Sequence, residues 1–228
     1  MVQYSKAIQD IMKRSEGSNT HSQRLNALQR RVHNATLSLE KVAAHRDPTL
    51  PIEAHKMKVA KATQKLQKML DKERQAVEDF RYTALGDLYK QIETRANLVP
   101  DPMYSPAILN RFIGMKPKEQ VAFLNELLAE GDGPSLAAIL NAPKAATGLS
   151  NEHSDRIYKA YTQAAAPEAS AALIEYDEVE NAASQTIKAA ARAATEMNDP
   201  AEVDRIIKDQ QKSIEAEQRL NKLTSEAQ

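Results

Sequence analysis

Five lysines form the most regular pattern of chemically active side chains in the sequence. They follow one another at spacings of 3, 4, 3 and 4 residues, which puts them on one face of a helix. The five are Lys58, Lys61, Lys65, Lys68 and Lys72. We call them the lysine ridge, and we expect Arg24 and Arg31, on the preceding segment, to extend it. Ammonium groups in such a row hold phosphates or carboxylates but do not read bases, because Lys is a point charge.

Two interpretations of the lysine ridge remain open. In the first, it contacts a polyanion: a nucleic-acid backbone such as DNA, an acidic partner, or the acidic half of this chain. The absence of any acidic residue over 56–70 favours this contact. In the second, it is a solvated flank whose aliphatic stems cover a neighbouring apolar seam. No aromatic residue alternates with the lysines, so stacking on single-stranded bases is not indicated.

Residues for catalysis or metal binding do not form a recognisable pattern. The sequence has no Cys, which excludes a thiolate ligand or nucleophile. No Ser lies in a Gly-x-Ser-x-Gly elbow, and there is no Gly-x-x-x-x-Gly-Lys phosphate loop. No two histidines have the i, i+4 spacing of a helical zinc pair. We therefore predict no enzyme, metal or cofactor. An enzyme would need a cleft joining Tyr104, Asn110, Arg111 and His153.

Composition narrows the class of protein further. The chain has 228 residues with 31 Lys+Arg and 31 Asp+Glu, which argues against a wholly basic nucleic-acid binder. It has no Trp and 4% aromatic residues, so a large aromatic-lined pocket is not expected. Residues 1–95 hold 18 basic and 11 acidic residues, a net charge of +7. Residues 96–228 hold 13 and 20, a net charge of −7, and this asymmetry favours head-to-tail self-association or an internal clasp.

Hydropathy predicts where the protein is found. No apolar run approaches the roughly 18 residues that a membrane-spanning helix needs, so we predict no membrane span. The segment that begins with Met1 has no apolar core of a signal peptide. We expect a protein of the cytoplasm or of a virion, not one secreted by a signal peptide.

Helices are the elements that must position these side chains. Apolar residues recur with helical period between Gly- and Pro-rich breaks, and no segment alternates as a half-buried strand would. We predict an all-α fold in three parts. Residues 1–98 form a basic antiparallel helical hairpin or coiled coil, 99–166 a compact region of short helices, and 167–228 an acidic pair of helices.

An apolar seam at coiled-coil spacing is predicted to hold the hairpin together. On the helix that starts near Thr20 its residues are Leu25, Leu28, Val32 and Leu39, and on the helix over 52–96 they are Val59, Leu66, Met69, Val77, Phe80 and Leu88. After Met69 the regular spacing of these apolar residues is interrupted, as it is at a stutter in a coiled coil. The shorter helix can cover only half of the longer one. We therefore expect the other half to bind a second copy or another protein.

Helix ends are marked by capping residues. Thr20 is predicted to cap its helix, with Gln23 as its capping-box partner. Asp199 before Pro200 is predicted to cap the last helix. Beyond Ile207 the apolar stripe of that helix is thin, so we expect this part to fray or to be ordered by a partner.

The layout resembles that of small structural proteins of tailed bacteriophages. The shared features are a Cys-free, Trp-free, Ala-, Gln- and Lys-rich helical chain, a long element over 52–96 and a charged, thinly apolar tail over 200–228. Scaffolding, internal-core and ejection proteins of virions have this character. For a scaffolding protein the resemblance implies a helical C-terminal segment that docks on the coat protein. The candidate here is Lys208 to Lys222.

Three functional hypotheses follow. The first is a non-enzymatic structural or assembly protein that acts through helix–helix contacts, as a homo-oligomer or with other structural proteins of a virion or scaffold. The second is a helical protein that binds nucleic-acid phosphates non-specifically through the lysine ridge. The third is a helical adaptor or chaperone, which a stoichiometric protein partner would reveal.

Overall fold

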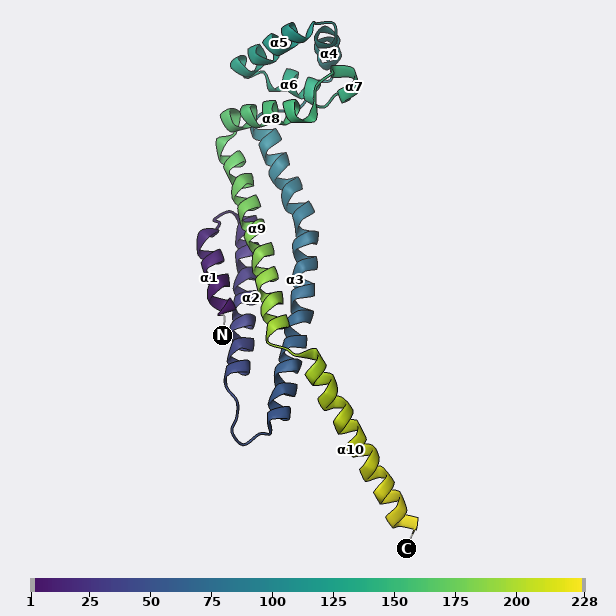
Figure 1. Cartoon of the computed structure of the whole chain (residues 1–228). Helices are drawn as coiled ribbons and strands as arrows, with labels where there is room; N and C mark the ends of the chain where they lie inside the picture. The colour runs from purple at the N-terminus through teal and green to yellow at the C-terminus, as the bar shows by residue number, and fades with distance from the viewer. Residues whose placement is uncertain (1–2, 227–228) are drawn as a thin grey trace. The chain divides into compact units, whose positions relative to one another are not determined.

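A computed structural model describes residues 3–226, with the side chains of residues 3–219. The described residues form ten helices and no strand, which confirms the predicted all-α class (Figure 1). The helices are α1 (Tyr4–Arg14), α2 (Thr20–Ala44), α3 (Ile52–Arg95), α4 (Ser105–Ile113), α5 (Pro117–Glu130), α6 (Gly133–Leu140), α7 (Lys144–Thr147), α8 (Asn151–Ala165), α9 (Pro167–Glu196) and α10 (Pro200–Glu226). The long helix α3 runs without interruption past Gly86.

The chain divides into two compact units. The first unit contains Met1–Glu78 and Glu178–Gln228, and the second contains Asp79–Asp177. Helices α3 and α9 each contribute residues to both units. The first and third segments predicted from the sequence, 1–98 and 167–228, likewise contribute to both units.

The first unit is a helical bundle, in which α2 is contacted by three other helices. The buried Gln29 side chain of α2 donates to the Val179 carbonyl of α9, at 3.3 Å. On another side, the Arg31 guanidinium forms two 2.9 Å hydrogen bonds with Glu73 of α3. The third contact joins α2 to α1, through the Glu40 carboxylate.

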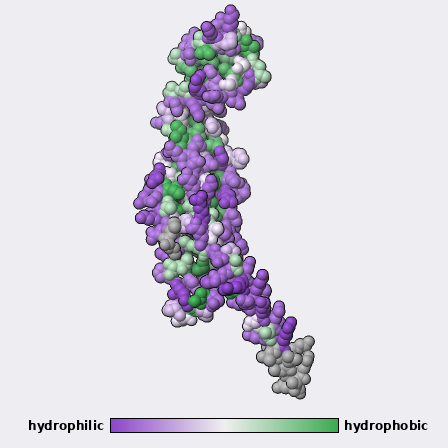
Figure 2. Space-filling view, in the orientation of Figure 1, coloured by the Kyte–Doolittle hydropathy of each residue, from purple (hydrophilic) through white to green (hydrophobic). Residues whose placement is uncertain are grey.

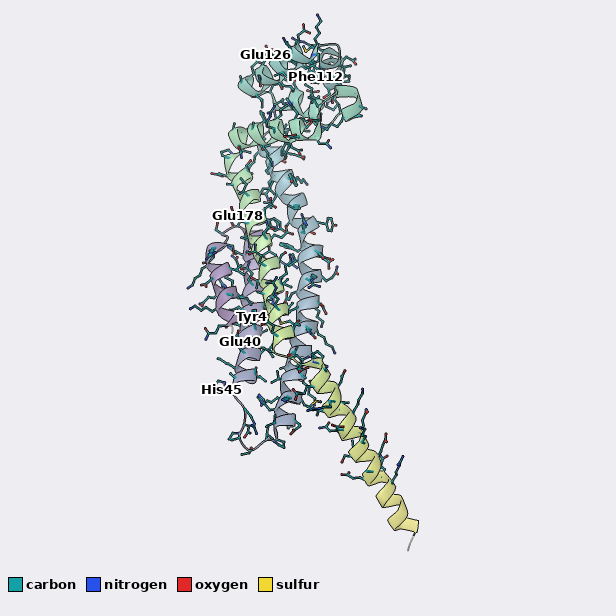
Figure 3. All side chains as sticks on the ribbon, in the orientation of Figure 1. Tyr4, Glu40, His45, Phe112, Glu126 and Glu178 are labelled. Carbon is teal, nitrogen blue, oxygen red and sulfur yellow. The ribbon has the colours of Figure 1, made fainter. Side chains whose placement is uncertain are left out.

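Glu40 is a buried carboxylate that caps α1 from the neighbouring helix. One of its oxygens accepts from the Ser5 backbone N–H at 2.9 Å, and the other accepts from the Ser5 hydroxyl. The first backbone N–H groups of a helix have no partner within the helix, and they attract negative charge. Glu40 therefore satisfies the start of α1, and Figure 3 shows it on α2 close to Tyr4. At the same end, a hydrogen bond to Glu196 of α9 raises the pKa of the Tyr4 hydroxyl.

The buried face of α2 is accordingly wider than the predicted seam. Eight of the ten predicted seam residues are buried, and Met69 and Phe80 are half-buried. The additional buried residues of α2 are polar: Ser22, Asn26, Gln29, Thr36 and Glu40. A two-helix hairpin buries one narrow stripe, whereas a helix inside a bundle buries more than one face. The arrangement in the first unit is thus a bundle of α1, α2, the part of α3 up to Glu78 and the part of α9 from Glu178 onward.

The predicted stutter near Met69 is wrong, because a polar residue occupies a buried position of α3. Thr63 and Leu70 are fully or almost fully buried, at 0% and 2% exposure, and Met69 is half-buried. Val59 and Ala60 are both buried, and from Thr63 the buried positions Leu66 and Leu70 follow at spacings of 3 and 4 without a shift. An apolar pattern cannot reveal a buried threonine.

The second part of α3 does not leave the open seam that the sequence led us to expect. In the second unit Ala84, Leu88 and Ile92 are buried, at 2% exposure or less. The Phe80 ring packs edge-on against Tyr176 of α9, with centroids 6.4 Å apart. The partner of this part of α3 is thus a helix of the same chain, and Tyr176 lies 96 residues after Phe80.

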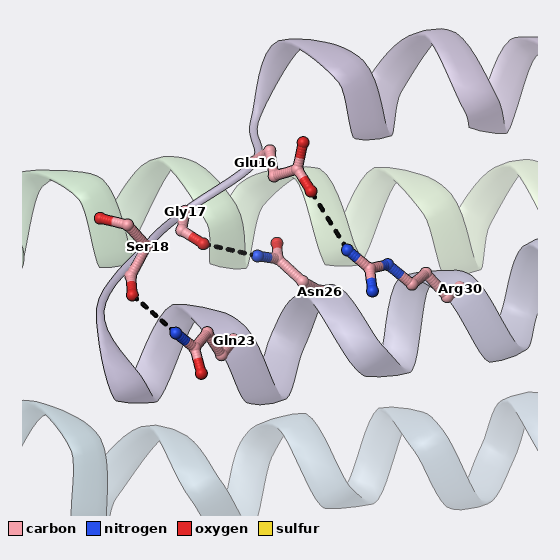
Figure 4. A network of polar contacts seen from close by, with 6 residues as sticks. All are labelled: Glu16, Gly17, Ser18, Gln23, Asn26 and Arg30. Carbon is pink, nitrogen blue, oxygen red and sulfur yellow. Dashed lines mark hydrogen bonds and ion pairs between the residues drawn. The ribbon is translucent and has the colours of Figure 1, made fainter.

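The start of α2 corrects the predicted cap. Asn19 is the capping residue, and its side-chain oxygen accepts from the Ser22 backbone N–H at 2.8 Å. Thr20 is the first helical residue, and the Gln23 amide donates to the Ser18 carbonyl at 2.9 Å. Asn ranks above Thr at this position, which accounts for the shift by one residue. Figure 4 shows this connection, including the 2.7 Å bond from Asn26 to the Gly17 carbonyl.

The second unit is built around the short helices α4 to α8. Its core joins residues of α4, α5, α6 and α8 with the ends of α3 and α9. The largest members include Phe112, labelled in Figure 3, and Tyr161. The Tyr161 hydroxyl lies 3.0 Å from the carbonyl oxygens of both Ala96 and Gly131, so α8 is joined to the end of α3 and to the loop after α5. Burial raises the pKa of Tyr161.

Candidate interaction surfaces

The lysine ridge lies on the solvent-facing side of α3, in the first unit. All five lysines are exposed, and none forms an ion pair with a carboxylate of the described residues. At 1.5 Å per residue, Lys58 and Lys72 are about 21 Å apart along the helix. Five ammonium groups at intervals of about 5 Å can hold a polyanion, or simply remain hydrated.

The two arginines predicted to extend the ridge are in different situations. Arg31 is exposed on α2, but its guanidinium is held by both oxygens of Glu73, and this hydrogen bond raises the pKa of Arg31. Such a two-bond pair fixes the planar group in place. Arg24 is exposed on α2. Arg31 thus belongs to the contact between α2 and α3.

The N-terminal end of α3 contacts the start of α10. Lys56, two residues before the ridge, forms an ion pair with Glu202 of α10. The Glu202 backbone N–H donates to the Asp199 side chain at 3.2 Å, which confirms Asp199 as the predicted cap of α10. Ile206, one turn after Glu202 on this helix, is buried. These contacts fix the first two turns of α10 on the bundle.

An open groove of ≈ 580 Å³ lies beside the ridge. Its walls come from the end of α2, the start of α3 and α10. They combine apolar and cationic side chains: Val42, Ala54, Met57, Lys58, Lys61, Ala62, Lys65 and Gln210. The groove joins the ridge to the α10 surface. The sequence did not predict it, because its three walls are far apart along the chain.

Beyond its first two turns, α10 has no covering element among the described residues. Every side chain from 207 to 219 is exposed, and these include Ile207 at 37% and Ile214 at 53%. In Figure 1 this part of α10 lies apart from the other helices of the first unit. The remaining side chains are mainly charged or amide, and Lys212 pairs with Asp209 within the helix. Lys222 and the rest of the predicted docking segment after residue 219 lie outside the described side chains.

The residues that an enzyme would need in one cleft do not converge. In the second unit the Arg111 guanidinium lies over the Phe123 ring, 4.7 Å from its centroid. The His153 ring nitrogen is paired with Arg156 at 3.3 Å. Tyr104 lines a cavity of ≈ 270 Å³, whose walls include none of Asn110, Arg111 and His153. Among the side chains of residues 3–219, no group of three or more His, Asp or Glu could hold a metal ion.

The face of the molecule in Figure 2 is mainly hydrophilic, with apolar residues scattered among polar ones. None of the described helices is both long and apolar enough to cross a membrane. No family model, curated protein or solved structure matches the chain.

Proposed function

We propose that this chain is a non-enzymatic assembly protein that acts through helix–helix contacts, with α10 as its contact element. The observation that supports this proposal is the exposure of every described side chain from 207 to 219 on a helix of 27 residues. Isolated helices are marginally stable in water. Most helices in proteins gain their stability from packing one apolar face against another element. A partner that covers α10 supplies that packing.

Ile207 and Ile214 mark the face of α10 that a partner would cover. They are seven residues apart, which places them on the same side of the helix. About half or less of each side chain is exposed, so covering one contributes on the order of 1 kcal/mol. One such contact is weak, and stable association requires several contacts at once. This requirement suits a protein that works in many copies.

The first partner we propose is a second copy of this chain, and the setting is a virion or its scaffold. The resemblance in layout to structural proteins of tailed bacteriophages supports the setting. For a scaffolding protein it implies a helical C-terminal segment that docks on the coat protein, and α10 contains the candidate segment, Lys208 to Lys222.

The test is the mass of the full-length protein in solution, for the wild type and for the variant with Ile207→Asp and Ile214→Asp. We expect the wild type to associate as concentration rises and the variant to remain a monomer that still unfolds cooperatively, because α1 to α9 do not depend on the contact. Ile113→Asp is the matched control, because Ile113 is also an exposed isoleucine at 43% but lies on α4. Association that survives the double substitution, or that the control also abolishes, would reject α10 as the contact.

A second candidate function is non-specific binding of nucleic-acid phosphates by the lysine ridge. The favouring observation is the row of five exposed lysines without ion pairs to described carboxylates. Each phosphate contact lowers the slope of log K against log salt by about 0.9. Changing Lys61, Lys65 and Lys68 to Gln should therefore make the negative slope for duplex DNA shallower by about 2.7.

The control for this DNA measurement carries the same change of charge elsewhere in the first unit. Lys6, Lys13 and Lys41 are exposed on α1 and α2, and we expect their replacement by Gln to change the slope much less. Equal slopes for the two triple variants would show that net charge, and not the ridge, determines binding. A wild type without measurable DNA binding would remove this candidate.

A further inference from the structure

We propose that a cavity in the second unit binds a linear organic diamine. The cavity has a volume of ≈ 640 Å³, within the range of small-molecule sites in proteins. Its walls are the end of α3, one side of α8 and the start of α9. The residues on which the argument rests are Tyr89, Glu93, Asp155, Tyr158, Leu173 and Asp177. This site lies outside α10 and the lysine ridge, so the inference is independent of the proposed function.

Charge at the cavity favours a cation. Three carboxylates line it, Glu93, Asp155 and Asp177, against one ammonium group, that of Lys159. The net charge of the lining is therefore −2. None of the three carboxylates forms an ion pair within the described part of the chain. They come from three different helices, so a ligand with two positive groups can contact more than one of them.

Two tyrosines supply a surface that suits an ammonium group. The rings of Tyr89 and Tyr158 have centroids 6.5 Å apart and are tilted by 56°. Aromatic faces attract cations, and the attraction grows as water is excluded. The Tyr158 hydroxyl is buried and has no hydrogen-bond partner, which costs free energy until a ligand supplies one. Burial raises the pKa of Tyr158 to about 12, so the hydroxyl is neutral and its oxygen can accept from an ammonium group.

Apolar residues between these polar groups indicate the shape of the ligand. Ile92 and Leu173 line the same cavity, and Ile92 is buried. A methylene chain can cover them while the amino groups at its ends face the carboxylates. A neutral polyol would leave the carboxylates unmatched, and an anion would be repelled. A diamine with a short aliphatic chain therefore fits both the charge and the apolar part of the lining.

The experiment is isothermal titration calorimetry of the full-length protein with 1,4-diaminobutane, and with 1,4-butanediol as the neutral probe. We expect saturable one-to-one binding of the diamine and none of the diol. Changing Asp155 and Asp177 to Asn should weaken diamine binding by on the order of tenfold or more. Tyr158→Phe should weaken it several-fold, because the ring stays and only the oxygen is lost.

The matched control removes two exposed carboxylates of α5, by Glu126→Gln and Glu130→Gln (Glu126 is labelled in Figure 3). Neither residue lines the cavity, so we expect wild-type affinity for the diamine. Thermal melting checks that each variant is folded. Three outcomes would overturn the proposal: no saturable heat up to about 10 mM diamine, equal loss of affinity in the two double variants, or equal binding of the diol.

Discussion

At Gly133, a single added methyl group would meet the backbone of a neighbouring helix end. A Cβ there would overlap the Asn97 carbonyl oxygen and lie 2.8 Å from both the Ala96 carbonyl and the Tyr161 hydroxyl. These groups belong to the junction of α3 and α8. We predict that Gly133→Ala lowers the free energy of unfolding by about 1–3 kcal/mol, because backbone cannot yield as a flexible side chain does. Chemical denaturation measures the change.

Gly86 provides the opposite case for the same substitution. It lies inside α3, and a Cβ there would meet nothing within 4 Å. Alanine costs less conformational entropy than glycine in a helix, so Gly86→Ala should raise the free energy of unfolding by about 0.5–1 kcal/mol. Similar effects of the two substitutions would contradict the packing described at Gly133.

Tyr158 predicts how stability responds to alkaline pH. Its pKa is about 12 in the folded protein against 10.0 for an ordinary tyrosine, with burial as the main cause. The unfolded state therefore loses the proton first as pH rises, and stability falls between pH 10 and about 12. Tyr158→Phe should make this fall shallower in denaturation curves taken at each pH. An identical pH dependence would place the hydroxyl in a less buried environment than the structure shows.

At the scale of the element, an apolar residue buried in a helix bundle and one exposed on a helix should respond differently to substitution by Asp. Leu28 on α2 is 4% exposed and Ile214 on α10 is 53% exposed. Leu28→Asp should cost more than about 3 kcal/mol, since it removes a core side chain and leaves an unpaired charge. Ile214→Asp should leave the melting temperature almost unchanged at concentrations at which the chain is a monomer, because no described residue covers this side chain. A small effect of Leu28→Asp would show that the first unit is not packed around α2.

The sequence alone predicts the helices far better than their partners. Period and breaks locate the long helix over 52–96 and the cap at Asp199, because those signals are local. They miss the buried Thr63 and Glu40, since the burial of a polar residue depends on which helices pack against it. They also assign the second part of α3 to an external partner. Only the three-dimensional structure shows that Tyr176 of α9 covers Phe80.

For the candidate surfaces too, the sequence predicts features that lie on one helix and misses those that several helices form together. The spacing of the five lysines alone predicts the exposed ridge, because one helix face presents them. The sequence also predicts that Arg31 joins the ridge, but the carboxylate that holds Arg31 is Glu73 on the next helix. The groove and the cavity each need three helices, so no local pattern could reveal them.

At the scale of the whole molecule, the charge asymmetry of the sequence persists in the two units. The first unit has 22 basic and 18 acidic residues, a net charge of +4, and the second has 9 and 13, a net charge of −4. Opposite net charges on the two units favour contacts between the first unit of one copy and the second unit of another. Such contacts weaken as salt is added, whereas apolar contacts through α10 do not.

The measurement that tests the central claim most directly is the light-scattering mass of the full-length protein, over a range of concentrations, at low and high salt, with and without duplex DNA. The account predicts a mass above the 25.3 kDa of one chain. This mass should rise with concentration, persist in high salt and be unaffected by DNA. A mass of one chain under all conditions would contradict self-association through α10. A monomer that gains mass only with DNA, and loses it in high salt, would instead make the lysine ridge the functional surface.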